Sequence, residues 1–106
     1  MTYAYVLVYS KTFGARDDVA DYLDGMPEIL NWRFEMSNSF FLVSDQPNAD
    51  IIARKLMRQA PKGASFLLME YPDNTQGLLT KGSWSLLNDK RTDRPLEFGV
   101  SWKKKK

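Results

Sequence analysis

The sequence predicts one domain of the α+β class, with strands and helices alternating in the order βαββαβ. Segments with an apolar residue at every second position, which is typical of strands, alternate with segments in which apolar residues recur every three or four positions, as in helices. Clusters of Gly, Pro, Asn and Ser separate these segments. With 106 residues, 43% hydrophobic and 26% charged, the chain has the size and composition of one globular domain.

The first predicted strand covers residues 3–10 and carries apolar side chains on both faces. It is rich in β-branched and aromatic residues, which favour strands. Its faces differ in size, with Ala4, Val6 and Val8 on one and Tyr3, Tyr5, Leu7 and Tyr9 on the other. Because small residues allow close packing against helices, we expect the tyrosines on the sheet face that the helices leave open.

The first helix is predicted over residues 16–26. Val19, Leu23 and Met26 recur there at helical spacing. Pro27 follows directly and ends the helix, because proline cannot continue the hydrogen-bonding pattern.

Two strands and a second helix come next, followed by a fourth strand. The strands at 29–36 and 40–44 are joined by a tight turn at 37–39, which predicts a hairpin. Residues 49–60 have apolar side chains on one side of a predicted helix, and 64–71 read as the fourth strand. Right-handed crossovers would place both helices on one face of a four-stranded antiparallel sheet, which is the ferredoxin-like arrangement.

The rest of the chain adds two further elements. Residues 81–88 predict a short helix, and a charged linker covers 89–95. A strictly alternating segment at 96–102 then predicts an additional C-terminal strand. We therefore expect a single ferredoxin-like domain over 1–102 and a basic tail at 103–106.

The residues that are missing exclude several kinds of chemistry. The chain contains no cysteine and no histidine, so one copy cannot hold a disulfide, a thiol nucleophile, a zinc finger or a serine–histidine–aspartate triad. Asp17, Asp21 and Asp24 share one side of the first helix. That spacing could hold Mg²⁺, but it is more typical of an exposed acidic surface. We predict no catalytic residue, no metal site and no cofactor.

Positive charge is concentrated at the end of the chain. Residues 103–106 are four lysines, and without them the formal net charge changes from +2 to −2. Such a tail attracts phosphates, although many basic tails only increase solubility. The second helix is also basic and could pair instead with the acidic first helix. Besides the tail, the expected contacts to RNA or DNA are Arg54, Lys55, Arg58, Lys62, Lys90, Arg91 and Arg94.

Large apolar side chains are expected on the open face of the sheet. A monomer rarely exposes so much apolar surface, so either nucleic-acid bases stack on this face or a protein covers it. We expect a homodimer, since two-fold dimers are the commonest oligomers, with the last strand exchanged between the two copies. The expected interface residues are Tyr3, Tyr5, Tyr9, Leu96, Phe98, Val100 and Trp102.

Several segments together resemble a known family. They are Tyr5-Val6-Leu7-Val8-Tyr9, the hairpin with Trp32 before the turn and Phe40-Phe41-Leu42-Val43 after it, and the additional last strand. This combination is similar to the ferredoxin-fold CRISPR-associated endoribonucleases and their small antitoxin-like and uncharacterised relatives. The resemblance implies homodimers packed sheet against sheet, in which the last strand extends the partner's sheet. It also implies a metal-binding aspartate at the end of the first strand, where this chain has Tyr9-Ser10-Lys11 and lacks the carboxylate.

We therefore predict a small homodimeric binding module, with RNA or DNA as the first class of ligand. A metal-dependent endoribonuclease and a protein-interaction or antitoxin-like module are the alternatives. No apolar run approaches the ~20 residues that a membrane-spanning helix needs, so we expect no membrane partner and a cytoplasmic location.

Overall fold

The computed structural model describes residues 1–34, 36–71, 78–90 and 92. Every predicted strand and helix in this part is present, and each predicted end lies within two residues of the observed one. The additional strand predicted at 96–102 lies outside the described residues. The elements are β1 (Tyr3–Tyr9), a single 3₁₀ turn (Lys11–Phe13), α1 (Arg16–Asp24), β2 (Ile29–Phe34), β3 (Ser39–Ser44), α2 (Ala49–Gln59), β4 (Phe66–Glu70) and α3 (Lys81–Asp89).

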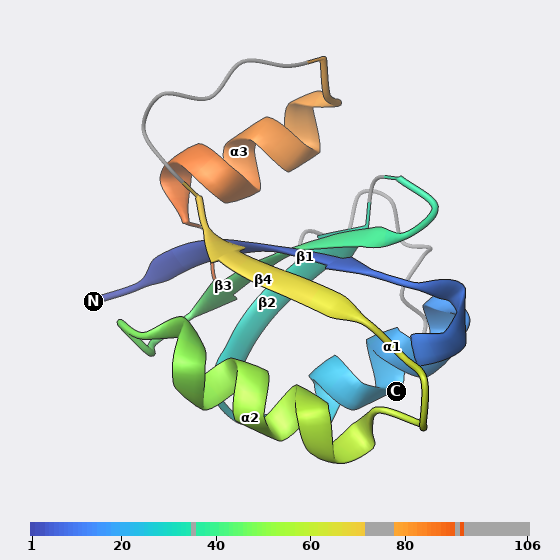
Figure 1. The fold of residues 1–106 in the computed structure, drawn as a ribbon. Coiled ribbons are helices and arrows are strands. Elements are labelled where there is room, and N and C mark those ends of the chain that lie inside the picture. The colour runs from blue at the N-terminus through green and yellow to red at the C-terminus, as the bar shows by residue number, and fades with distance from the viewer. Residues whose placement is uncertain (35, 72–77, 91, 93–106) are drawn as a thin grey trace.

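The four strands form one antiparallel sheet in the order β2-β3-β1-β4 (Figure 1). Helices α1 and α2 lie against one face of the sheet, and α3 lies against the other (Figure 1). This arrangement confirms the predicted α+β, ferredoxin-like fold. β1 is central: Leu7 lies opposite Phe40 of β3 on one side and Leu68 of β4 on the other. β2 and β4 are the two edges of the described sheet, and the pairing of β2 with β3 shifts register between Ile29 and Asn31.

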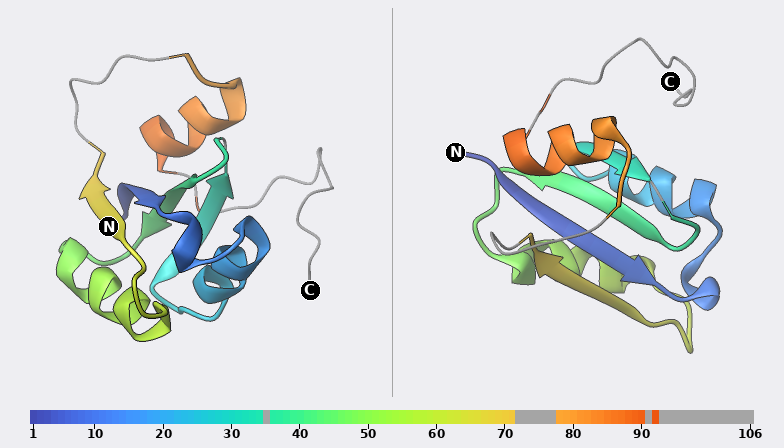
Figure 2. Two further views of the ribbon diagram at one scale, coloured as in Figure 1. Left: turned by 45° about the vertical axis from the view of Figure 1, so that its right-hand side comes forward. Right: turned by 90° about the horizontal axis from the view of Figure 1, so that it is seen from above.

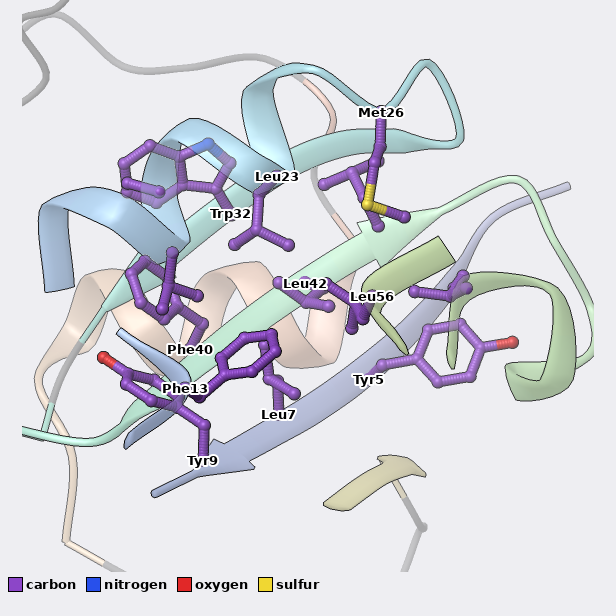
Figure 3. Packing of buried hydrophobic residues seen from close by; sticks show 14 residues of the cluster. Tyr5, Leu7, Tyr9, Phe13, Leu23, Met26, Trp32, Phe40, Leu42 and Leu56 are labelled. Carbon is purple, nitrogen blue, oxygen red and sulfur yellow. The ribbon is translucent and has the colours of Figure 1, made fainter. Parts of the chain in front are cut away.

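The larger core lies between the sheet and the helices α1 and α2. Tyr5, Leu7 and Tyr9 of β1 point into it, together with side chains from β3 and both helices (Figure 3). The expectation that the tyrosines occupy the open face is therefore wrong. Two helices lying across the sheet enclose a thick layer, and protein cores are packed without voids. Large aromatic side chains fill that layer, whereas alanine and valine would leave it empty.

A smaller core lies on the opposite face, beneath α3. Ala4 of β1 and Phe41 and Val43 of β3 pack there against Leu86 and Leu87 of α3. Here the small side chains of β1 allow a helix to approach closely, but the helix is α3 and not the α1–α2 pair. The adjacent residues Phe40 and Phe41 consequently lie in different cores, as strand geometry requires.

Both ends of α3 are attached to the sheet by polar contacts. Nε of Arg33 donates a hydrogen bond to Oγ of Ser83 at 3.0 Å near the start of the helix. A Cβ atom on Gly82 would lie 2.6 Å from Cζ of Arg33, so glycine is what lets the helix rest on the guanidinium. At the other end, the Tyr71 hydroxyl donates to Oδ1 of Asn88 at 2.7 Å. These contacts fix the position of α3 over the sheet.

Among the described residues, none of the helices has both the length and the apolar character needed to cross a membrane.

Candidate functional site

The most exposed apolar side chains of the sheet lie on its edge strand β4. Leu67 is 59% exposed and Met69 is 43% exposed. They lie directly opposite Val8 and Val6 of β1, on the same face as α3. We call these four residues, Val6, Val8, Leu67 and Met69, the β4 surface. Seen from above, α3 lies over β3, and β4 lies to one side of it (Figure 2).

The backbone of β4 also directs hydrogen-bonding groups along its outer edge, where no other strand of the described residues pairs with it. The amide of Tyr71 donates to the carbonyl of Ala4, and the amide of Ser10 donates to the carbonyl of Ser65, each at 2.8 Å. In an antiparallel pair, bonded and non-bonded positions alternate. Residues 65, 67, 69 and 71 therefore bond to β1, whereas Phe66, Leu68 and Glu70 direct their N–H and C=O groups outward. Within the described sheet, β1 is the only neighbour of β4.

The two ends of β4 carry opposite charges. Lys11 and Lys62 are exposed at the end where the strand begins, and the hydrogen bond between Ser10 and Ser65 holds their two segments together. The exposed carboxylate of Glu70 lies at the end where the strand finishes. Ion pairs within the described part of the chain involve none of these three charged side chains. The edge therefore has a basic end and an acidic end.

The basic residues expected on α2 are only partly available to a ligand. Nε of Arg54 is 2.8 Å from Oδ2 of Asp50 in the same helix. Lys55 forms an ion pair with Glu28, which precedes β2. The hydrogen bond from Lys55 is the main cause that lowers the pKa of Glu28, and burial partly opposes it. The expected pairing between α1 and α2 is therefore replaced by these two ion pairs.

The remaining basic residues do not form one surface. Arg58 and Lys62 are exposed on and after α2, and neither takes part in an ion pair with another described residue. Lys90 follows α3, which lies on the opposite face of the sheet (Figure 1). Arg91 and Arg94 lie outside the described residues. The structure thus brings the α2 residues together and separates them from Lys90.

Two of the tyrosines expected at a dimer interface are buried within one copy. Tyr5 is 0% and Tyr9 is 4% exposed, and Tyr3 packs partly buried against the same core. The hydroxyl of Tyr5 donates to the carbonyl of Gln46 at 2.6 Å. Burial raises the pKa of Tyr5 and of Tyr9, so both hydroxyls stay neutral. The other expected interface residues, Leu96, Phe98, Val100 and Trp102, lie outside the described part.

The carboxylates of α1 do not gather into a metal centre. Asp17 lies beside Arg16, with 3.5 Å between Nε and Oδ1. Oδ1 of Asp24 accepts a hydrogen bond from Nε1 of Trp32 at 2.7 Å, which ties α1 to β2. Among the residues that the structure describes, there is no group of three or more acidic side chains placed to hold a metal ion. The carboxylate of Asp24 therefore serves to hold α1 against β2.

The β4 surface was not among the surfaces expected from the sequence. Its signal was present, because the segment Phe66–Glu70 places apolar residues on both faces. Phe66 and Leu68 pack against the larger core, so Leu67 and Met69 must lie on the opposite face.

Comparison of the chain with protein-family models, with curated proteins and with solved structures found no significant match.

Proposed function

We propose that this protein is a non-catalytic interaction module that works as a homodimer and associates through the β4 surface. The observation that supports the proposal is the exposure of Leu67 and Met69, 59% and 43%, side by side on an edge strand. Natural edge strands usually carry proline, lysine or a bulge that prevents pairing with another chain. β4 contains neither proline nor lysine, and its pairing with β1 is regular.

A second copy is the partner that this surface fits best. The β4 surface presents apolar side chains and free backbone groups together, and two-fold pairing satisfies both with one interface. The exchange of a C-terminal strand at 96–102 stays a prediction, because that segment lies outside the described residues. The smaller β4 surface takes the place of the tyrosine face that the sequence suggested.

The variant Leu67→Glu tests this proposal. Association would place two carboxylates in the apolar interface, so we expect dimerisation to weaken at least about a hundredfold. Sedimentation equilibrium across a concentration series would measure the change. Ile51→Glu is the matched control, because Ile51 is also an exposed apolar residue, at 42%, but lies on α2 and not on the β4 surface. It lies one helical turn before Lys55, on the side of α2 that contacts Glu28. A wild-type protein that stays monomeric at all concentrations would refute the proposal.

Nucleic acid is a second candidate ligand, supported by the exposed cations Arg58 and Lys62. Replacing both with glutamine is expected to weaken binding of single-stranded RNA or DNA and to reduce the slope of log affinity against log salt concentration by roughly one to two. Fluorescence anisotropy across a salt series would measure this. Lys81→Gln is the control, since Lys81 begins α3 on the opposite face. Equal losses in the two variants would assign the binding to overall charge.

A further inference from the structure

We propose that two copies pair antiparallel through their β4 strands, with Leu68 on the two-fold axis. The four strands of each copy then form one continuous eight-stranded sheet. This inference rests on the proposed homodimer and specifies its geometry. The outward-facing backbone groups, the exposed side chains and the end charges of β4 each favour this pairing.

The direction of the backbone groups fixes the centre of the pairing. Phe66, Leu68 and Glu70 have outward N–H and C=O groups, as derived above from the bonds to β1. With Leu68 on the axis, it lies opposite Leu68 of the second copy, and Phe66 lies opposite Glu70. Each of the three facing pairs exchanges two hydrogen bonds, which gives about six in all.

Placing a different residue of β4 on the two-fold axis is less favourable. An axis through Leu67 would leave Glu70 opposite a residue outside β4, and an axis through Met69 would leave Phe66 opposite one, so each loses a hydrogen-bonded pair within the strand. A centre on Phe66 would leave Glu70 opposite a residue outside β4, and a centre on Glu70 would do the same for Phe66. Only Leu68 lets all three outward-facing residues pair within the strand.

The same register covers the exposed apolar side chains. Leu67 of each copy lies opposite Met69 of the other, at positions that exchange no hydrogen bonds. Side chains approach each other more closely at such positions than at bonded ones. The two exposed apolar residues of β4 thus cover each other in the pair.

Charge favours the antiparallel direction. Each β4 has Lys11 and Lys62 near its first residue and Glu70 at its last. Antiparallel pairing places the basic end of one copy beside the acidic end of the other, and the two-fold axis repeats this contact. Parallel pairing would place like charges together. Exposed charges at this spacing mainly decide between orientations and add little affinity.

A single cysteine at the centre of the strand tests the geometry directly. The chain has no cysteine of its own, so Leu68→Cys introduces a unique thiol. Facing residues at a bonded position have Cα atoms about 5.5 Å apart, a separation that a disulfide spans. We expect mild oxidation to convert most of the Leu68→Cys protein to a covalent dimer. Ile51→Cys places the thiol on α2 instead of β4 and should form little covalent dimer.

Glu70→Pro tests the backbone bonds without touching the core. Its N–H points outward, so proline removes a bond to the second copy and none to β1. We expect dimerisation to weaken about tenfold or more, with circular dichroism unchanged. Glu70→Gln removes the charge but keeps the backbone N–H, so it should weaken dimerisation less than Glu70→Pro does.

The outcomes separate this inference from the proposed function. A dimer in which Leu68→Cys does not crosslink and Glu70→Pro has no effect overturns the β4–β4 geometry and leaves the homodimer standing. A monomeric wild-type protein overturns both. Crosslinking at Leu68 together with weakening by Glu70→Pro establishes the pairing.

Discussion

Replacing Phe40 with alanine is expected to lower the free energy of unfolding by about 3–5 kcal/mol. Phe40 is 0% exposed at the centre of the larger core. The centre of its ring is 5.4 Å from that of Trp32, 5.9 Å from that of Tyr9 and 6.1 Å from that of Phe34. The cavity would separate β1, β2 and β3 from the helices that cover them. Since domains are typically stable by only 5–15 kcal/mol, this loss is a large fraction of the total stability.

Urea unfolding followed by circular dichroism and tryptophan fluorescence would measure this loss. Leu67→Ala is the matched control, because Leu67 is an apolar strand residue that is 59% exposed. Its effect should stay within about 0.5 kcal/mol in dilute, monomeric protein. A cost for Phe40→Ala below about 1 kcal/mol would mean that the core lies elsewhere.

Replacing the next residue, Phe41, should instead loosen α3. Phe41 is 3% exposed, and its side chain packs against α3 on the other face of the sheet. Its removal costs about 3–5 kcal/mol of packing locally, enough to detach a nine-residue helix. The larger core should stay folded, because Phe41 contributes nothing to it. The free energy of global unfolding should therefore fall less than in Phe40→Ala.

Hydrogen exchange distinguishes the two results. In Phe41→Ala, the amides of α3 should exchange much faster, while those of β1 keep most of their protection. Trp84, which lies in α3, should also show a shift in fluorescence. An equal loss of protection in β1 and α3 would show instead that the two cores unfold as one unit.

The order of the elements could be predicted from the sequence because periodicity is local. The assignment of faces in β1 could not. The sizes of Ala4 and Tyr5 indicate that the two faces differ, but not which helices cover each. The register with β3 decides this, because Leu7 lies opposite Phe40 and Val6 lies opposite Phe41. That register joins residues more than 30 positions apart, and no local pattern contains it.

The candidate site was predicted less well than the fold, for a related reason. The helix at α3 was expected, but its place on the open face depends on Arg33, about 50 residues earlier. With α3 covering the sheet beside β1, the large apolar side chains that stay exposed within the four described strands are those of Leu67 and Met69 on β4. Lys55 was counted among free cations because its partner, Glu28, lies 27 residues away. Interactions between distant segments determined each of these outcomes.

The register shift in β2 limits how far the proposed sheet can grow. β2 is the other edge of the described sheet, and its ladder is interrupted between Ile29 and Asn31. A bulged edge is twisted and makes a poor template for another strand. Pairing about Leu68 would use the regular edge of each described sheet and leave the bulged edges outside. The proposed assembly would then stop at two copies, and the β4 edge would not serve as the template for a fibre.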